Sequence, residues 1–527
     1  MVVSRPVRLS LVFMLIEIAA CGGGSSQDGG PHLGPGGTGG TTTVATGGGG
    51  ATTGTGGTVG PGGLTVTYDP NGATAGTAPL DTTQYAGGQT VTVPGNTGAL
   101  TYPGYAFIGW QTQADGSGKA YAPGATFAIG GANLTLYALW AGGYAYTVNH
   151  NDGGKGTIAQ FVIGPNGALT AMPKPTVDAG GTDTRYIAVD PAGKYIYASN
   201  PAANNQQGTL TQLTIDQTNG SLSPMSPLTV PFPTTWNSSP GASVVHPTGN
   251  WLYFTNTQPG LGGAVSQFTI GATGDLTSPS LVMIGQNPGR TSPYGIAIDP
   301  SGKYAYVTAT NGAGTGGVYQ YTVDPTTGVL QPNPSSDDNV VATTPVTSLG
   351  WAQPWDIKVL QIASGEYAYV SNYDDGTVWE LAVNPADGTL TPLGAFLVAP
   401  TTVCTCEAGG NNIAAMGIAL HPSGKSVYVT FSCCSSLQSV AQFTVNQTDG
   451  TLSPMTPATV LSSGSSQSIA VESSGKYAYV TSGETGFASS SIAQYTIDQA
   501  SGALSLMANP KVNTGGVGPS GIVTIGQ

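Results

Sequence analysis

One strand–turn–strand unit recurs through most of the chain, and this repetition restricts the possible folds more than any single residue. The clearest copy runs from Gly295 through the turn Asp299-Pro300-Ser301-Gly302 to Val307, and a further strand follows over residues 318–324. Alternating aromatic and aliphatic residues around a Pro-Ser-Gly turn indicate half-buried strands rather than a helix. A unit repeated in this way is typical of a repeat architecture.

The number of copies predicts the architecture. The second tyrosine of the second strand occurs seven times, at Tyr146, Tyr197, Tyr253, Tyr306, Tyr369, Tyr428 and Tyr479. The first copy starts at Tyr144 without an inner strand of its own, whereas residues 519–525 read as an inner strand without a partner. We therefore predict an all-β chain in which residues 141–527 form a seven-bladed β-propeller closed by strand exchange, which removes exposed ends.

The composition limits the possible partners. Only 7% of the residues are charged, and 13 Lys and Arg against 26 Asp and Glu give a net charge of −13. Neutralising a phosphate backbone requires a basic surface. We therefore expect no nucleic-acid partner.

The N-terminal residues predict export and attachment to a membrane. Arg5 and Arg8 precede an apolar run from Leu9 to Ile18, which is too short to span a bilayer and fits a signal peptide over residues 1–21. The end of this segment resembles a bacterial lipobox, which implies lipidation of Cys21; the alternative is an ordinary cleaved signal with an incidental cysteine. Residues 22–63 are mostly Gly, Thr, Ser and Pro and are expected to form a flexible tether. Gly22 after the cysteine resembles the outer-membrane sorting signal of bacteria with two membranes, which implies an outer-membrane lipoprotein of the cell envelope, outside the cytoplasm. We also expect a monomer.

Residues 64–140 follow a different pattern. They contain Leu64–Gly72, then Gly104–Trp110, and then Leu134–Trp140. This order resembles the internalin-type B repeat, which implies a small β-grasp-like module of bacterial surface proteins. Trp110 and Trp140 are expected in its core, and the alternative is an exposed ligand platform.

Residues 141–527 resemble the lactonase family of seven-bladed propellers, the 6-phosphogluconolactonase-like group. The resemblance rests on the repeated Asp-Pro-x-Gly-Lys-Tyr-x-Tyr turn, as at 190–197, and on the Asp-x-x-x-Gly-x-Leu hairpin, as at 216–222. Both motifs specify a scaffold rather than an activity. The enzymes of the group carry a Pro-His-x-His segment before an inner strand, and no histidine occupies the corresponding places here. His246 and His421 instead replace the turn aspartate and are expected to be turn residues.

Strand direction predicts which loops share a face. The segment before each inner strand and the loop after each Tyr-x-Tyr strand meet at one end of the propeller. The candidate catalytic residues there are His150 as a general acid or base, Arg185 and Arg290 as receptors for a carboxylate or phosphate, and Asp356. The candidate ligand-binding residues are Tyr294, Trp355 and Tyr373. The alternative is that these are solvated loop residues and turn caps.

Four cysteines lie close in sequence to the two ends of one strand pair. Cys404 and Cys406 precede one inner strand, and Cys433 and Cys434 follow the next strand of the same unit. In an oxidising compartment we expect two disulfides between these pairs, in either order; a zinc site of four thiolates is the minor alternative. The few scattered histidines predict no metal site, and no cofactor fingerprint occurs in a suitable context.

Two functions remain open at this stage. The first is a surface protein that binds glycans or envelope proteins through the propeller face and the B-repeat module. The second is a lactone hydrolase that acts on a small anionic sugar lactone. The missing histidine segment favours the first, and the family resemblance keeps the second open.

Overall fold

The computed structural model describes residues 63–526, except 153, 202–206, 234–238, 259–261, 285–291, 311–315, 334–339, 343–352, 399–412, 434–436, 463 and 484–489. All regular elements in these ranges are β-strands. The described ranges contain no helix of the length and hydrophobicity that crossing a membrane requires. The described residues belong to one compact unit.

The segment before the propeller forms two small sheets. One sheet has the order β1 (Val66–Asp69), β6 (Leu134–Ala141), β3 (Ala106–Gln111) and β4 (Ala120–Tyr121), with β1 parallel to β6, and β2 (Thr90–Thr92) pairs with β5 (Thr126–Ala128). Trp110 and Trp140 are almost fully buried. Their indole N–H groups donate to the carbonyl oxygens of Pro94 and Pro70, at 2.9 and 3.2 Å. Their burial shows that both tryptophans are core residues, as predicted. The two hydrogen bonds satisfy indole N–H groups that are cut off from water.

Within the described residues seven sheets follow, each with an inner strand, two middle strands and an outer strand. Blade 1 contains β35 (Pro519–Gly526), β7 (Gly143–Asp152), β8 (Lys155–Ile163) and β9 (Leu169–Asp178), and blade 2 contains β10 (Tyr186–Val189), β11 (Tyr195–Asn200), β12 (Thr209–Ile215) and β13 (Leu222–Pro231). Blade 3 contains β14 (Ser239–Val245), β15 (Trp251–Gln258), β16 (Gly262–Ile270) and β17 (Leu276–Met283), and blade 4 contains β18 (Ser292–Ile298), β19 (Tyr304–Thr310), β20 (Gly316–Val323), and β21 (Leu330–Pro332) with β22 (Val340–Ala342) at its outer edge. Blade 5 contains β23 (Pro354–Ile362), β24 (Gly365–Asn372), β25 (Thr377–Val383) and β26 (Leu390–Leu397), and blade 6 contains β27 (Ile413–Leu420), β28 (Ser426–Cys433), β29 (Leu437–Val445) and β30 (Leu452–Leu461). Blade 7 contains β31 (Ser465–Val471), β32 (Tyr477–Gly483), β33 (Ser491–Ile497) and β34 (Leu504–Asn513).

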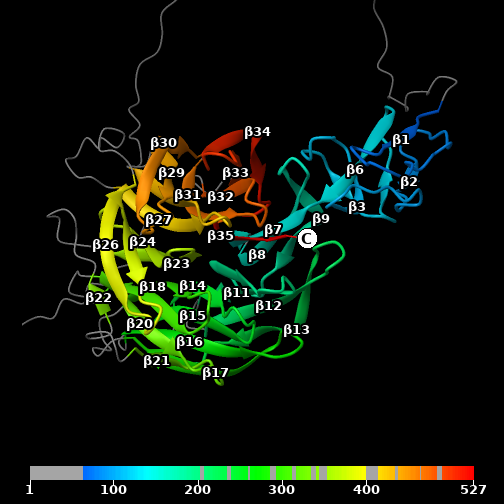
Figure 1. Ribbon diagram of the computed structural model, residues 1–527. Helices are drawn as coiled ribbons and strands as arrows, with labels where there is room; N and C mark the ends of the chain where they lie inside the picture. Colours follow the sequence, from blue (N-terminus) through cyan, green and yellow to red (C-terminus); the bar gives the residue numbers. More distant parts are fainter. Residues whose placement is uncertain are drawn as a thin grey trace, which may run out of the picture. The chain divides into compact units, whose positions relative to one another are not determined.

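The blades are arranged around a centre, with the inner strands β14, β18, β23, β27 and β35 closest to it (Figure 1). The C-terminal strand β35 pairs antiparallel with β7, which opposes Ile522 to Thr147 and Val523 to Tyr146. The first blade is thus completed by the last strand of the chain. This arrangement confirms the predicted propeller fold and its strand-exchange closure.

The seven repeated tyrosines hold neighbouring blades together. Each hydroxyl donates to the carbonyl of a hairpin glycine in the next blade, at 2.6–2.8 Å. The pairs are Tyr146–Gly220, Tyr197–Gly274, Tyr253–Gly328, Tyr306–Gly388, Tyr369–Gly450, Tyr428–Gly502 and Tyr479–Gly167. Because the tyrosines are buried, each bond satisfies a hydroxyl that would otherwise lose its water partners. The repeated Tyr-x-Tyr sequence is therefore a contact between blades as well as a strand.

The hairpin glycine is required at each of these junctions. Gly388 has a φ of 74°, and a Cβ at this position would lie 2.3 Å from the Tyr304 ring. We expect Gly388→Ala to lower the free energy of unfolding by roughly 2–4 kcal/mol, through left-handed backbone strain and overpacking. Chemical denaturation measures this loss. Gly249, whose φ is 78° and whose added Cβ would only just contact Pro191, provides the control. An equal loss in Gly249→Ala would show that the ring contact contributes nothing.

A second contact between blades uses the glutamine of the third strand. In five blades its Oε1 accepts from the backbone N–H of the leucine that begins the outer strand of the next blade. In four of them the amide Nε2 also donates to a carbonyl 14 or 15 residues later, in the outer strand of the same blade. Blade 5 carries Glu380 in place of this glutamine.

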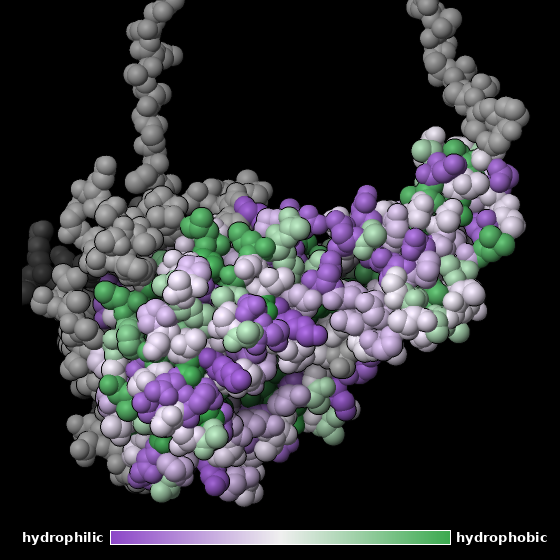
Figure 2. All heavy atoms as spheres, turned by 45° about the horizontal axis from the view of Figure 1, so that its top comes forward, coloured by the Kyte–Doolittle hydropathy of each residue, from purple (hydrophilic) through white to green (hydrophobic). Residues whose placement is uncertain are grey.

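The surface reflects the low charge of the sequence. The face drawn in Figure 2 is mostly pale or hydrophilic, with hydrophobic residues in small separate groups. The exposed large hydrophobic residues are Leu80, Met283, Tyr373, Leu393, Leu397, Leu461 and Leu506. Isolated apolar residues of this kind are common on soluble surfaces.

Candidate functional site

A β-bulge opens the inner strand of six blades at one end of the propeller. Two residues of the inner strand there oppose one residue of the next strand, as Tyr294 and Gly295 oppose Thr308. The equivalent pairs are Ser520–Gly521, Gly241–Ala242, Trp355–Asp356, Met416–Gly417 and Gln467–Ser468. In blade 2, Arg185 immediately precedes β10. We call this end, where the inner strands begin, the mouth face, and the opposite end, with the Asp-Pro turns, the turn face.

Hydroxyl groups opposite the bulges connect consecutive blades. Thr255 Oγ1 donates to the Tyr294 carbonyl at 2.7 Å, and Thr308 Oγ1 donates to the Trp355 carbonyl at 3.1 Å. Ser371 and Thr430 make the corresponding bonds to Met416 and Gln467. These bonds fix the backbone that carries the candidate residues. We did not predict them, although a Ser or Thr two residues after the repeated tyrosine in six blades was a visible signal.

The three aromatic residues predicted to bind a ligand lie together on the mouth face. The Tyr294 and Trp355 rings stack with centroids 4.9 Å apart, and the Tyr373 ring lies 5.2 Å from Trp355. Trp355 is thus central to an aromatic stack formed by blades 4 and 5, which we define as Tyr294, Trp355 and Tyr373. Tyr294 and Trp355 are half-buried, whereas Tyr373 is 39% exposed. Pairs of this kind are held by ring contact in addition to burial.

Polar groups surround the aromatic stack. Burial raises the pKa of Tyr294, whereas its hydrogen bonds with the side chains of Gln353 and Thr310 lower it. Asp374 is exposed, and its negative charge also raises the pKa of Tyr294. Burial, with the neighbouring charge of Asp375, raises the pKa of the Asp374 carboxyl.

The loop that carries Tyr373 is built on buried polar side chains. Thr377 Oγ1 donates to Asp375 Oδ1 and accepts from Asn372 Nδ2. Asp375 Oδ2 and Asn372 Oδ1 are buried without a protein partner. Burial raises the pKa of the Asp375 carboxyl. The loop is therefore ordered, and it holds a carboxyl oxygen without a protein donor.

Asp356, a candidate catalytic residue, is occupied by neighbouring groups. Lys358 Nζ lies 2.7 and 2.9 Å from its two carboxyl oxygens. Asp356 Oδ2 also accepts from the backbone N–H of Ile418 in the next blade, at 2.9 Å. Both carboxyl oxygens therefore pair with Lys358, and Oδ2 also joins blade 5 to blade 6. This geometry fits a structural role for Asp356.

His150, Asp183 and Arg185 form a second cluster, at the junction of blades 1 and 2. Arg185 donates to Asp183 Oδ2 through Nε and lies 2.9 Å from it through a terminal nitrogen. His150 Nδ1 lies 3.9 Å from Asp183 Oδ1. Burial lowers the pKa of His150, Asp183 opposes this effect and Arg185 adds to it. His150 Nε2 is buried without a protein partner.

Tyr186 is a mouth-face residue that sequence reasoning missed. It follows Arg185, at the position where blades 1, 4 and 6 have glycine. Burial raises its pKa, Arg185 lowers it, and Asp356, Tyr294 and Asp183 raise it further. The pKa of the Tyr186 hydroxyl therefore depends on residues of blades 2, 4 and 5. Only its departure from the repeated glycine could have identified it.

Several predicted residues lie outside the described part of the chain. These are Cys21, Arg290, Cys404, Cys406 and Cys434, and the side chain of Cys433 at the end of β28 is also not described. The predictions of lipidation, of the two disulfides and of an Arg185–Arg290 receptor therefore stay predictions. Within the described ranges, no three His, Cys, Asp or Glu side chains are placed to hold a metal ion.

His246 and His421 have the role expected of turn residues. His246 Nδ1 pairs with Thr248, and its Nε2 lies 2.8 Å from the Gly302 carbonyl of the next blade. His421 makes the same pair of contacts, with Ser423 and Gly475. Both rings are fully used by the scaffold and lie away from the mouth face.

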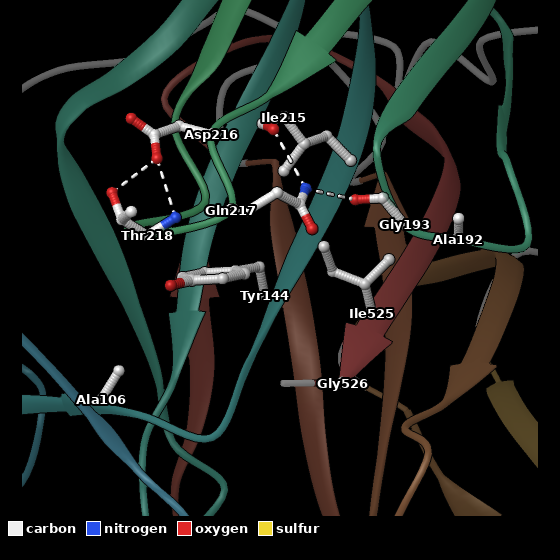
Figure 3. Close-up of a pocket in the computed structure, with 10 residues that line it drawn as sticks. All are labelled: Ala106, Tyr144, Ala192, Gly193, Ile215, Asp216, Gln217, Thr218, Ile525 and Gly526. Carbon is white, nitrogen blue, oxygen red and sulfur yellow. Dashed lines mark hydrogen bonds between the residues drawn. The ribbon is translucent and has the colours of Figure 1, made fainter. Parts of the chain in front are cut away.

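A cavity of about 470 Å³ lies at the turn face. Its lining residues are Ala106, Tyr144, Ala192, Gly193, Ile215, Asp216, Gln217, Thr218, Ile525 and Gly526 (Figure 3). Gln217 Nε2 donates to the carbonyls of Gly193 and Ile215, and Thr218 donates to Asp216. The side chains of Asp216 and Gln217 are thus used in hydrogen bonds that stabilise the turn and the hairpin. We therefore assign no catalytic role to this cavity.

Comparisons with known proteins agree with this organisation. Residues 65–139 match the model of the Listeria-Bacteroides repeat domain. Over 76 residues the chain is 49% identical to a "Putative membrane protein" of Evansella cellulosilytica, a match that covers 14% of this chain and 11% of that protein. The chain thus spans about a tenth of the length of this curated relative.

The remainder of the chain is similar in fold to solved lactonase-like propellers. A "putative 6-phosphogluconolactonase" from Bacteroides fragilis matches with a TM-score of 0.56 and 18% identity, over 73% of this chain and 98% of that chain. The periplasmic gluconolactonase of Pseudomonas aeruginosa matches with a TM-score of 0.56 and 16% identity, over 72% and 99%. At these identities the likeness shows the fold alone. The chain carries a Listeria-Bacteroides repeat domain and a propeller of the 6-phosphogluconolactonase-like fold, which confirms both predicted resemblances.

Proposed function

We propose that this protein is a binding protein of the bacterial cell envelope that recognises a surface glycan through the aromatic stack on its mouth face. The observation that supports it is the packing of Tyr294, Trp355 and Tyr373 into one stack. Tyr294 and Trp355 stand on bulges whose carbonyls accept hydrogen bonds from threonine hydroxyls of the preceding blade. Aromatic rings contact the C–H faces of sugars, and preordered rings lose little conformational entropy on binding. The proposed partner is either the glycan itself or an envelope protein that carries it.

The charges at the inner strands support a ligand that is not an anion. Arg185 is paired with Asp183, and Lys358 is paired with Asp356. A carboxylate or phosphate would compete with these aspartates for its contacts. The described part of the mouth face therefore favours a neutral or cationic ligand over the anionic sugar lactone considered from the sequence.

We also propose attachment to the outer membrane through a lipid on Cys21, with residues 22–63 as a tether and the protein acting as a monomer without a cofactor. The apolar run before Cys21 and the composition of the tether support this arrangement. The name of the Evansella relative, a membrane protein, agrees with a place in the envelope.

The second candidate function is lactone hydrolysis. One observation favours it: His150 has a buried, unpartnered Nε2 and lies near Asp183, and its lowered pKa keeps the imidazole neutral, the form that acts as a general base. The names of the solved structures with this fold agree with such chemistry. Asp183 already forms a salt bridge with Arg185, so an anionic lactone would compete with this carboxylate for the arginine, and we rank this function second.

Binding to a panel of defined bacterial oligosaccharides tests the proposed function. We expect Trp355→Ala and Tyr373→Ala to weaken binding at least about tenfold, because they remove ring contact, and Tyr373→Phe to retain it. Calorimetry measures affinity, and thermal unfolding checks that each variant is folded. Assays of lactone hydrolysis use the same preparations. Hydrolysis that disappears in His150→Ala but persists in Trp355→Ala, without oligosaccharide binding, would replace this proposal by the second candidate.

A further inference from the structure

The aromatic stack lies in an acidic setting. Asp374 follows Tyr373 directly, is exposed, and acts electrostatically on Tyr294. Asp375 is the next residue in the chain, and its Oδ2 is buried and unpartnered. Neither carboxylate has an ion pair with a described base, in contrast to Asp183 and Asp356, which have Arg185 and Lys358. The stack is therefore flanked by negative charge that the described residues do not neutralise.

An aromatic ring and a carboxylate recognise the same kind of ligand group. The face of a ring attracts a cation through its quadrupole, and a nearby carboxylate adds direct attraction. Tyr373 is the most exposed ring of the stack, so its surface is open to such a group. The net charge of −13 for the whole chain also draws cationic ligands toward the protein.

We propose that the glycan bound at the aromatic stack carries free amino groups, and that an ammonium group binds between the Asp374 carboxylate and the exposed ring of Tyr373. The inference rests on the proposed glycan-binding function and names the chemical class of the glycan as a polymer of amino sugars that are not acetylated. Sugar rings contact the aromatic stack, and the ammonium group provides selectivity. The raised pKa of Asp374 agrees with a carboxylate that a cation would stabilise.

Two tetrasaccharides that differ only in acetylation separate the inference from the proposed function. We expect the β-1,4-linked glucosamine tetramer to bind about fivefold more tightly than the N-acetylglucosamine tetramer at low salt, and this preference to shrink as salt is added. Asp374→Asn is expected to remove the preference and to leave the affinity for the acetylated tetramer unchanged. Asp498→Asn, which removes the same charge at a hairpin of the turn face, is the matched control and is expected to keep the preference.

Each outcome of calorimetry decides the inference. Equal affinity for both tetramers, with no effect of Asp374→Asn, would overturn the amino-group inference while the binding function stands. Loss of the preference in Asp498→Asn as well would assign it to overall charge and would also overturn the inference. If neither tetramer binds, the inference is wrong, and the wider oligosaccharide panel decides the proposed function separately.

Discussion

Removal of residues 519–527 is expected to abolish the cooperative unfolding transition of the propeller. These residues form β35, which supplies the inner strand of blade 1 and also contacts β31, β32 and β10. Ile522 is buried between blades 1 and 7, and Val523 and Ile525 pack against the core between blades 1 and 2. Burial of Ile522 contributes about 1.5–3 kcal/mol, and the partly buried Val523 and Ile525 contribute less each. With the lost strand pairing to β7, this is a large part of the stability of a typical domain, roughly 5–15 kcal/mol.

Calorimetry and circular dichroism of the truncated chain measure this effect. The control lacks only Gln527, which lies beyond β35, and is expected to unfold like the full chain. A truncated chain with an unchanged transition would show that closure by β35 contributes little to stability.

Replacement of Glu380 by glutamine is expected to stabilise the protein at neutral and higher pH. Glu380 Oε1 accepts from the Leu452 N–H at 2.6 Å, as glutamine does in other blades. In four other blades the second polar atom of the glutamine is an amide nitrogen that donates to a carbonyl, for example from Gln442 to Pro457 at 2.7 Å, whereas Glu380 has an oxygen as its second polar atom. Only the protonated acid can donate there. Burial raises the pKa of Glu380 to about 7, with a smaller contribution from Asp449.

The sign of the pH dependence follows from this raised pKa. In the unfolded chain Glu380 ionises near its ordinary value of 4.5, whereas the folded protein holds the proton until about pH 7. The folded state therefore binds more protons in this window, and its stability falls as the pH rises from about 4.5 through 7. Above pH 7 the full loss is present, at roughly 3 kcal/mol. We expect Glu380→Gln to remove this slope and to match the natural protein near pH 4.5.

Urea denaturation between pH 4 and 8 measures the difference between the two proteins. Glu366 has a pKa raised likewise to about 7, by burial and by Asp299, but it contributes equally to both proteins and cancels. Gln442→Glu provides the matched control, because it places the same carboxyl in blade 6 and should introduce a similar slope. Parallel stability curves for the natural protein and Glu380→Gln would contradict the assignment of this slope to Glu380.

Much of the fold could be predicted because it is repeated in local sequence. The alternation around Tyr304 and Tyr306 and the Pro-Ser-Gly turn specify strand pairs without knowledge of distant contacts. The missing inner strand before Tyr144 and the spare strand after Pro519 also predicted the closure. The tyrosine and glutamine hydrogen bonds between blades were not predicted. A tyrosine or glutamine in a strand pattern does not show that its polar end reaches a glycine carbonyl 82 residues away, as Tyr306 does, or a leucine N–H 70 residues away, as Gln320 does.

The candidate site was predictable in part. Strand direction placed Trp355 and Tyr373 on one face, and the structure brings them into contact with each other. The pairing of Asp356 with Lys358 and of Arg185 with Asp183 was not predicted. Residue type identifies a possible acid, base or anion receptor. Whether that side chain is already engaged in an ion pair depends on the direction in which it points, which the tertiary structure sets.

The sequence alone determined the all-β repeat, its closure by the last strand and the absence of the histidine segment, because each is a property of local pattern and order. The tertiary structure alone decided that the mouth face presents stacked rings and paired charges. The physical reason is that stacking and ion pairing depend on ångström-scale distances between blades. Those distances are set by bulges, glycine contacts and hydroxyl bonds across the ring, which join residues that no local pattern relates.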